Sequence, residues 1–466
     1  MKKGEYDMIV YNTESRKKEE FKPLEGNVVR MYTCGPTVYK DAHIGNLRTY
    51  IFMDTLRRVL KYNGYELRHA MNITDVGHLT SDGDEGEDKM EKSAREEKKD
   101  PMEIANFYMD RFLTDFKRLN IDFPEIICRA TDHISEMIEY VKGLVEKGFA
   151  YETSTAIYFD VSKLDRYGVL SNVNLDDQIA GARVEVDSEK RNPYDFALWI
   201  KAPKEHIMKW DSPWGLCYPG WHIECSAMGK KYLGEVFDIH TGGIDLVPTH
   251  HENEIAQAKG LNGKEPVKYW MHTEFLLVDG GKMSKSLGNV YTISELMEKG
   301  YDPLDYKMFT FTAHYRNKLN FTWDGLDAAR TSLIRLKQTI AKHKESEEKT
   351  DLEVLASIKQ KFQDALDDDI NMPVALGVLW ELVKLPKSKD VYEMAMDFDR
   401  VFGLKLDELE EVKEETIPDE ILELVEKRKE AKSNKDYALA DSIRDEVTAK
   451  GYIIEDTKDG AKVKKA

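Results

Sequence analysis

The sequence predicts an α/β fold with a doubly wound parallel sheet, an insertion within that sheet domain and α-helical domains after it. Residues 27–33 and 65–74 are rich in β-branched and aromatic residues, and a helical pattern separates them, so they form a β-α-β unit of about fifty residues. Strand and helix patterns alternate again after Trp210, whereas helical apolar periodicity dominates beyond Lys285. Because parallel strands end at one edge of a sheet, ligands are expected at that edge.

The segment 31–46 follows the first strand and leads into a helix that Gly64 is expected to end. A strand, a glycine-broken loop and a helix N-terminus form a site for an anionic group, because unpaired N–H groups and the helix dipole point toward it. His43 and Asn46 lie where that helix begins. The alternative for His43 is a packed loop histidine with no role in binding.

The other elements follow from local signals. Asp100, Pro101 and Glu103 provide an N-cap, a first-turn proline and a capping-box glutamate. We expect a turn at 241–245, and the charged segment after His78 is interpreted as a loop or an exposed helix. The expected elements are a hairpin within 1–21, helices at 100–120, 132–147, 221–233 and 248–260, strands at 150–161, 181–186 and 235–240, helices at 293–299, 304–312 and 326–344, and a pair of helices within 352–384 that is joined at 369–373.

Composition favours a globular protein over a membrane or disulfide-stabilised one. The 466 residues allow roughly two to four domains. No signal peptide and no apolar run of membrane-spanning length occurs, and four cysteines are too few for a disulfide framework, so we expect a cytoplasmic location and no membrane partner. Cys128 falls in the expected insertion and is interpreted as a buried thiol. A net charge of −18 argues against nucleic-acid binding by the whole surface, although one basic face would suffice.

A candidate metal site combines two cysteines, a histidine and a glutamate at junctions between strands and helices. His250 and Glu254 are four residues apart on one predicted helix, so their side chains share a face. Taken alone, such a pair is more often a surface hydrogen bond. Cys34 and Cys225 lie at neighbouring junctions, and two thiolates, an imidazole and a carboxylate suit zinc. Cys217 is a rival ligand.

Two lysines form a candidate phosphate-binding loop. Lys282 and Lys285 follow a pair of glycines, which predicts a flexible loop that presents two ammonium groups. The alternative is a solvated basic turn.

Five segments, in this order and at these separations, resemble the cysteinyl-tRNA synthetases, a family of class I aminoacyl-tRNA synthetases with a Rossmann-type catalytic domain. The segments are MYTCGPTVYKDAHIGN (31–46), MNITDV (71–76), PGWHIECSAM (219–228), TGGIDLVPTHHENEIAQ (241–257) and KMSKSLGN (282–289). The resemblance extends over nearly the whole chain. One departure is Asn46, because many class I members have a histidine there, and an asparagine amide cannot become cationic.

The resemblance implies a role for each motif residue. His43 and Lys285 would be the catalytic groups, and Thr74 and Trp221 would line the amino-acid pocket, although Trp221 is nearly as easily a plain core aromatic. The implied zinc ligands are Cys34, Cys225, His250 and Glu254. The implied ATP contacts are His43, Gly45, Asn46, Gly242, Gly243, Asp245, Lys282 and Lys285.

The resemblance also implies a function and a domain order. The chain would activate L-cysteine with ATP and Mg²⁺ and then transfer it to tRNA(Cys). It would act as a monomer that holds one zinc ion per chain. The rivals are a mycothiol-type cysteine ligase and a zinc-stabilised nucleotide-binding protein without turnover. The expected segments are 1–124 and 203–280 for the two halves of the catalytic domain, 125–202 for the insertion, 281–345 for the signature loop and stem-contact helices, 346–410 for an anticodon-binding-like helical domain, and 411–466 for a basic tail domain.

Overall fold

The central sheet consists of five parallel strands, as the sequence predicts. Their spatial order is β12 (Val267–Thr273), β11 (Phe237–Gly243), β3 (Val28–Thr33), β4 (Glu66–Ile73) and β5 (Ile126–Arg129). The chain leaves β3 toward β4 and β5 on one side and returns to β11 and β12 on the other. The carboxyl ends of β3 and β11 therefore meet at the switch point where such sheets bind ligands.

The structure is a computed structural model that describes residues 8–77, 88–172, 189–283, 287–409, 418–434, 436–457 and 460–465. It divides into two units, Met1–Leu409 and Glu410–Ala466. Within the described residues, no helix is both long enough and apolar enough to cross a membrane.

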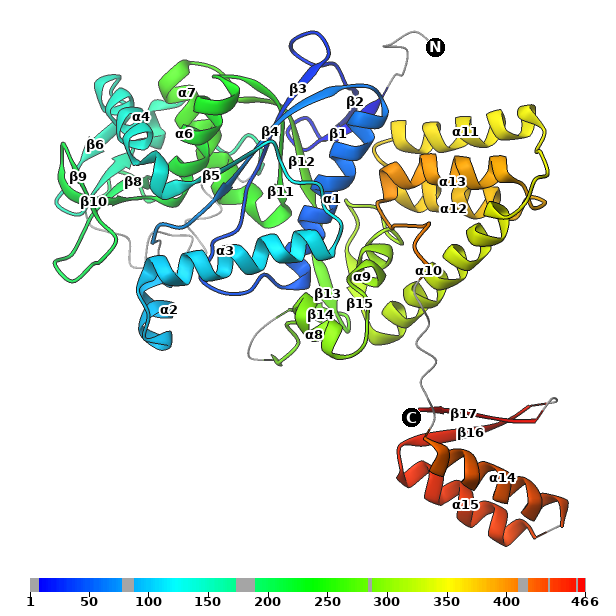
Figure 1. Ribbon diagram of the computed structural model, residues 1–466. Coiled ribbons are helices and arrows are strands. Elements are labelled where there is room, and N and C mark those ends of the chain that lie inside the picture. The colour runs from blue at the N-terminus through cyan, green and yellow to red at the C-terminus, as the bar shows by residue number, and fades with distance from the viewer. Residues whose placement is uncertain are drawn as a thin grey trace. The chain divides into compact units, whose positions relative to one another are not determined.

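Alternate residues of the central strands face two different hydrophobic cores, as the period of a β-strand requires. Met31 and Met71 pack with α1 (Ile44–Tyr62), which connects β3 to β4. Tyr32 and Ala70 face the opposite core. That core also contains residues of α4 (Ile134–Glu146), α6 (Trp221–Leu233) and α7 (Glu252–Asn262), and Figure 1 shows α6 and α7 side by side.

The first unit also contains the predicted N-terminal hairpin and the predicted capped helix. The hairpin consists of β1 (Ile9–Asn12) and β2 (Lys17–Glu20). A capping box between Asp100 and Glu103 opens α3 (Pro101–Arg118). Part of the charged segment after His78 forms α2 (Lys89–Glu97), whereas residues 78–87 lie outside the described part of the chain.

The insertion forms an antiparallel sheet that extends beyond residue 202. Its strands, in spatial order, are β6 (Ala150–Glu152), β7 (Ala156–Phe159), β8 (Phe196–Lys201), β10 (Gly215–Pro219) and β9 (Trp210–Ser212). The hairpin of β9 and β10 pairs back onto β8, so residues up to Pro219 belong to this sheet. The strand expected at 181–186 lies outside the described residues. Short 3₁₀ turns, η1 (Ala130–His133) and η2 (Val161–Lys163), complete this region.

Two local predictions near the end of the central sheet are wrong. Strand β11 continues through Gly243, where we expected a turn, and the turn η3 (Ile244–Leu246) comes afterwards. A π-turn, η4 (Val247–His251), precedes α7, which ends at a left-handed Gly263 and not at Gly260. Gly260 lies inside α7, where a Cβ would come within 2.9 Å of Leu144 Cδ2, so close packing accounts for this glycine and helix termination does not.

Among the described residues of the first unit, a small sheet and six helices follow the central sheet. The sheet contains β14 (Gly281–Lys282), β13 (Leu276–Val278) and β15 (Leu319–Phe321). The helices are α8 (Ile293–Glu298), α9 (Pro303–Thr310), α10 (Trp323–Lys344), α11 (Leu352–Asp367), α12 (Met372–Leu382) and α13 (Lys389–Phe402). In Figure 1, α1 lies between the central sheet and α13, and α1 and α13 are in contact.

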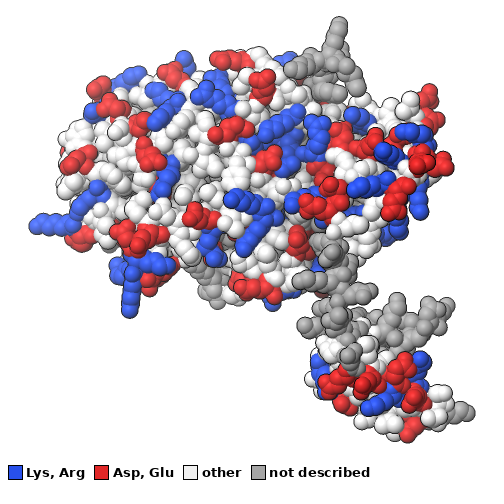
Figure 2. All heavy atoms as spheres, in the orientation of Figure 1, with Lys and Arg blue, Asp and Glu red and all other residues white. Residues whose placement is uncertain are grey.

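The second unit packs two helices against a hairpin. Its elements are α14 (Asp419–Ser433), α15 (Tyr437–Ala449), β16 (Tyr452–Thr457) and β17 (Gly460–Lys465). Figure 2 shows acidic and basic side chains intermixed on its visible face. The predicted basic character is wrong for 411–466 as a whole, in which Asp and Glu outnumber Lys and Arg; it applies only to 426–466.

A buried ion pair joins α1 to α9. Asp54 and Lys307 are both fully buried, and Lys307 Nζ lies 2.9 Å from Asp54 Oδ2. The same ammonium donates to the carbonyl oxygens of Leu119 and Asn120, which follow α3. An ammonium has three N–H donors, so each of them has an acceptor here.

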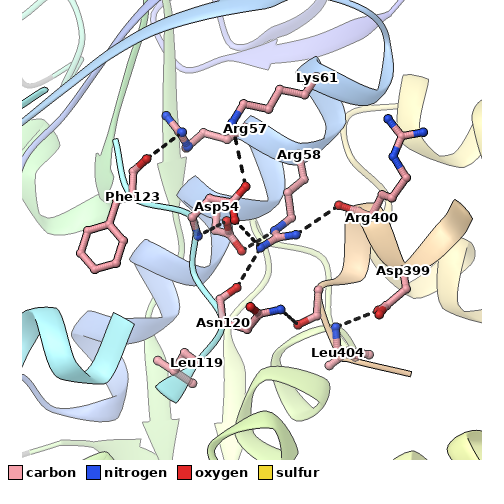
Figure 3. A network of polar contacts seen from close by, with 12 residues as sticks. Asp54, Arg57, Arg58, Lys61, Leu119, Asn120, Phe123, Asp399, Arg400 and Leu404 are labelled. Atoms are coloured by element: carbon pink, nitrogen blue, oxygen red, sulfur yellow. Dashed lines mark hydrogen bonds and ion pairs between the residues drawn. The ribbon is translucent and has the colours of Figure 1, made fainter. Parts of the chain in front are cut away.

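Arg58 extends this network toward α13 (Figure 3). Its Nε donates to Asp54 at 2.8 Å, and its terminal nitrogens donate to the carbonyl oxygens of Asn120 and Arg400. Asn120 in turn donates to the carbonyl oxygen of Gly403. The network thus fixes the C-terminal half of α1, whose N-terminus lies at the edge of the sheet.

Substitution Lys307→Met is expected to lower the free energy of unfolding by about 3–5 kcal/mol, because it leaves a buried carboxylate without its main partner. Equilibrium urea unfolding of the full chain measures the change. The matched control is Lys361→Met, which removes a half-exposed pair with Glu381 and should cost about 0–1 kcal/mol. Equal effects of the two substitutions would contradict a stabilising role for the buried pair.

Candidate active site

Four side chains predicted to share a metal converge at the carboxyl edge of the central sheet. Cys34 follows β3, Cys225 lies in the first turns of α6, His250 lies in η4, and Glu254 lies in α7. All four are buried, and one ligand atom from each lies within 4.8 Å of the others. The structure therefore brings together residues that are up to 220 positions apart in the sequence.

The distances between these atoms fit a tetrahedral metal site. Zinc bonds of about 2.0–2.3 Å in a tetrahedron place neighbouring ligand atoms about 3.3–3.8 Å apart. The Sγ atoms of Cys34 and Cys225 are 3.7 Å apart, and Cys225 Sγ lies 3.4 Å from His250 Nε2. His250 Nε2 lies 3.2 Å from Glu254 Oε1, and Cys34 Sγ lies 4.0 Å from that oxygen. The group could thus hold one metal ion with little rearrangement.

Two further histidines give a second possible ligand set, which the sequence analysis missed. His240 of β11 and His251 of η4 combine with Cys34 and Glu254 within the same distance limit. His251 Nε2 lies 3.3 Å from Cys34 Sγ, and His240 Nε2 lies 3.1 Å from Glu254 Oε2. The adjacency of His250 and His251 was the available signal, but a regular helix would have turned them to different faces.

Burial and mutual contact perturb the ionisation of this group. Burial raises the pKa of the Cys34 thiol to about 11 and that of Cys225 well above its usual range. Burial opposes the charge on His250, yet contacts with Cys225 and Glu254 raise its pKa to about 10. Burial also opposes the charge on Glu254, but His240 and His250 lower its pKa to about 2. A bound cation would stabilise the thiolate forms, because a metal deprotonates coordinating thiols.

The two remaining cysteines lie away from this cluster. Cys217, the rival ligand, is on β10, where its Sγ lies 3.8 Å from the carbonyl oxygen of Trp214. Cys128 is on β5, and its Sγ donates to the carbonyl oxygen of Met71 at 3.5 Å. Both thiols are buried, so they provide internal controls for the cluster.

His43 and Asn46 form a capping box at the start of α1. The Asn46 backbone N–H donates to His43 Nδ1 at 3.2 Å, and the His43 backbone N–H donates to Asn46 Oδ1 at 3.3 Å. Burial, with help from Lys40, lowers the pKa of His43 to about 4, so its ring is neutral near pH 7. Because Nδ1 accepts, the ring proton is on Nε2, which leaves an N–H donor beside the helix N-terminus.

The candidate phosphate-binding loop, which contains Lys282 and Met283, lies against the start of α1. A Cβ on Gly45 would lie 2.2 Å from Met283 Cε, so the absence of a side chain at residue 45 makes room for Met283. The Ile44 N–H also donates to the carbonyl oxygen of Tyr291 at 2.8 Å. Lys282 is exposed on β14, whereas Lys285 lies outside the described residues.

The predicted adenosine-binding residues lie at the end of β11. A Cβ on Gly242 would come within 2.8 Å of His251 Cε1, and a Cβ on Gly243 within 2.3 Å of Asp245 Oδ1. Close packing against the buried His251 therefore favours a glycine at residue 242, whereas at residue 243 the exposed Asp245 side chain has room to move aside. Asp245 itself is exposed in η3.

The two predicted pocket residues flank the cluster. The half-buried Trp221 ring lies 4.4 Å from the His250 ring, centre to centre. Thr74 is buried at the end of β4, and its hydroxyl donates to Glu224 Oε2 at 2.7 Å. Burial raises the pKa of Glu224 to about 8, and the hydrogen bond from the Thr74 hydroxyl offsets part of that rise. Sequence reasoning did not select Glu224.

Comparisons with known proteins agree with this arrangement. The family model described as "tRNA synthetases class I (C) catalytic domain" matches residues 20–331, and the model described as "DALR domain" matches residues 361–387. Cysteine–tRNA ligase of Treponema denticola is 44% identical over 479 residues, which cover 96% of this chain and 97% of that protein. Cysteine–tRNA ligase 1 of Burkholderia lata is 46% identical over 460 residues, which cover 98% and 96%.

The fold is also similar to a solved structure, Mycobacterium tuberculosis methionyl-tRNA synthetase in complex with methionyl-adenylate. The TM-score is 0.57 at 16% sequence identity, and the match covers 81% of this chain and 89% of that one. At this identity the similarity concerns the fold alone.

Metal content tests the cluster directly. Substitution Cys34→Ser or Cys225→Ser should lower the metal bound per chain at least about tenfold after dialysis against a chelator, because each removes a ligand. Inductively coupled plasma mass spectrometry measures the content. Cys128→Ser and Cys217→Ser are matched controls and should keep the metal, since their thiols lie elsewhere. Loss of metal in the controls as well would contradict the assignment.

The same measurement separates the two possible ligand sets. If the set with both cysteines holds the metal, His250→Ala should lower the metal bound per chain at least about tenfold more than His251→Ala does. The opposite order would assign the metal to the set that contains His240 and His251.

Proposed function

Because this chain belongs to the cysteine–tRNA ligases, a family of class I tRNA synthetases, we propose that its buried cluster holds a zinc ion that selects the substrate thiol. The family joins L-cysteine to tRNA in an ATP-dependent reaction. The observation that carries the proposal is the convergence of two thiols, an imidazole and a carboxylate, all buried, within 4.8 Å of one another.

The proposed metal would distinguish cysteine from serine. Serine differs from cysteine by oxygen in place of sulfur, and packing against differences of this size provides only about 1–3 kcal/mol. When bound, zinc would prefer a thiolate to a hydroxyl and would lower the thiol pKa toward neutrality. Cys34, Cys225, His250 and Glu254 are the residues that would hold it. Trp221, beside His250, would close one side of the amino-acid pocket.

Activation joins the substrate carboxylate to ATP. The carboxylate attacks the α-phosphorus, pyrophosphate leaves, and cysteinyl-adenylate forms. Negative charge grows on the phosphate oxygens, so donors fixed in advance stabilise the transition state. His43 Nε2–H and the backbone N–H of Gly45 would supply such donors at the start of α1, where Asn46 holds the His43 ring by donating to its Nδ1.

The two lysines and the glycines at the end of β11 would complete the proposed ATP site. Lys282 and Lys285 would add positive charge at the phosphates, with Mg²⁺ bound to the nucleotide, and the contact of Met283 with Gly45 supports this location of the loop. Gly242, Gly243 and Asp245 would hold the adenosine. In the second step the terminal ribose hydroxyl of tRNA takes the cysteinyl group, and AMP leaves.

The helical region gives a surface for tRNA(Cys). We assign residues 281–345 to contact with the tRNA stem and residues 346–410 to the anticodon, which the match of residues 361–387 to the DALR domain supports. One chain contributes every residue of the proposed site, so we propose a monomer. The four free cysteines favour a cytoplasmic location.

Substitution Cys225→Ser tests the proposed selection. Cysteine-dependent exchange of pyrophosphate into ATP should fall at least about 100-fold in kcat/KM, while exchange with serine should change little, because only the thiol uses the metal. Cys217→Ser is the matched control and should behave as wild type. If discrimination between cysteine and serine survives the loss of the metal, the proposed role of zinc is wrong.

A further inference from the structure

The buried guanidinium group of Arg48, in α1, donates to backbone carbonyl oxygens of two separate segments. Its Nη1 lies 2.7 Å from the oxygen of Glu274 and 2.8 Å from that of Phe275. Its Nη2 lies 2.6 Å from the oxygen of Asn317 and 3.4 Å from that of His314. These four acceptors match the four N–H groups on the terminal nitrogens, so the fork of Arg48 holds both segments at once.

The charge of Arg48 makes this arrangement costly. Burial lowers the pKa of its guanidinium group, which shows that the interior disfavours the cation. Among the described residues, its hydrogen bonds go to carbonyl oxygens and not to a carboxylate. A buried cation without a paired anion is rare, so the arrangement suggests a role beyond packing.

The two segments that Arg48 binds are joined to each other and continue into the small sheet. The Glu274 N–H donates to the carbonyl oxygen of Tyr315 at 2.9 Å. The segments lead into β13 and β15, which pair with each other, and β14 pairs with β13. Lys282 ends β14, so this sheet is the base of the candidate phosphate-binding loop. Arg48 therefore connects α1 to the base of that loop.

Asp369 provides a second hold on residues 314–317. Its buried carboxylate accepts from the Tyr315 hydroxyl and from Arg316 Nε, both at 2.7 Å. Its backbone oxygen lies 3.0 Å from His314 Nε2. These bonds fix the turn independently of α1, so the turn is a reference point against which Arg48 can hold the helix.

Packing around the Arg48 side chain leaves space for movement. A cavity of about 30 Å³, which is room for about two water molecules, lies beside Arg48. Thr273, Thr310 and Met372 are among the residues that line it. Densely packed side chains would resist a shift of α1, whereas a cavity permits one. Loss of the Arg48 fork should therefore change the position of the helix start.

That helix start carries one half of the proposed phosphate site. His43 and Gly45 lie about one turn before Arg48, and Met283 of the candidate phosphate-binding loop occupies the space beside Gly45. A phosphate group held between the helix start and the loop requires a fixed separation of the two. A misplacement of reacting groups by about 1 Å can slow a reaction about 100-fold.

We propose that Arg48 is a positioning residue for adenylate formation, which fixes the start of α1 relative to the base of the candidate phosphate-binding loop. It acts through the helix and the small sheet, because its terminal N–H groups are used by carbonyl oxygens and leave no donor for the nucleotide. The inference rests on the proposed function, since that function assigns the ATP phosphates to this helix start.

Substitution Arg48→Lys tests the proposal in the zinc-loaded, full-length protein. The lysine keeps the positive charge but cannot span both segments. In cysteine-dependent ATP–pyrophosphate exchange, kcat/KM for ATP should fall at least about tenfold, because the two halves of the phosphate site lose their fixed separation. The inhibition constant of adenosine, which lacks phosphates, and the KM for L-cysteine should each change less than about twofold. Unchanged kcat/KM for ATP would overturn the proposal.

Arg58→Lys is the matched control. Arg58 lies near the other end of α1 and also donates to two backbone carbonyl oxygens, those of Asn120 and Arg400 (Figure 3). Its substitution should lower the midpoint of thermal unfolding but change kcat/KM for ATP less than about twofold. An equal fall in both variants would indicate general loosening of α1 and would refute a positioning role for Arg48.

Asp369→Asn keeps the test decisive if Arg48→Lys folds poorly. It weakens the second hold on residues 314–317 and leaves α1 unchanged. We expect kcat/KM for ATP to fall at least about threefold while the inhibition constant of adenosine stays within about twofold. With Arg48→Lys unfolded, wild-type kcat/KM for ATP in Asp369→Asn would overturn the proposal.

Failure of the proposed function has a different signature. Wild-type protein without any cysteine-dependent exchange would refute both that function and the role of Arg48. Exchange in the wild type that Arg48→Lys retains in full would refute the role of Arg48 alone.

Discussion

The parallel direction of the five central strands is the constraint on which the site depends. Parallel strands all end at one edge, so the residue that follows each strand is delivered to the same place. Cys34 follows β3, Thr74 follows β4, and the turn with His250 comes after β11. The chain leaves β3 toward one side of the sheet and leaves β11 toward the other side, so a gap opens between these two connections. The candidate site residues lie at that gap.

Two kinds of buried ionisable group occur in this protein, and their hydrogen bonds distinguish them. Lys307 has an acceptor for each of its N–H groups, so its pairing with Asp54 is complete within the protein. Among the described residues no group donates to Glu224 Oε1, and the thiols of Cys34 and Cys225 have pKa values raised by burial. The first arrangement holds α1 in place. The group of Glu224, Cys34 and Cys225 is not fully paired within the described part of the protein, as is typical of a binding site without its ligand.

Local patterns in the sequence predicted the parallel sheet and most helices, because strand alternation, helical periodicity and capping residues act over a few positions. The motifs also selected the four candidate metal ligands. The π-turn before α7 was not predictable, and with it the approach of His251 to Cys34 was missed. The pairing of Asp54 with Lys307 was missed for a similar reason, since 253 positions separate them and neither belongs to a motif.

The distance along the chain between the four proposed metal ligands has a consequence for biosynthesis. Cys34 emerges from the ribosome early, but Glu254 follows 220 residues later, after the entire inserted sheet. Until Glu254 has been made, no nascent segment contains all four proposed ligands, so uptake of a metal ion at this cluster would require closure of the tertiary structure. Scarcity of the ion in the cell would then act on newly made chains before it affected mature ones.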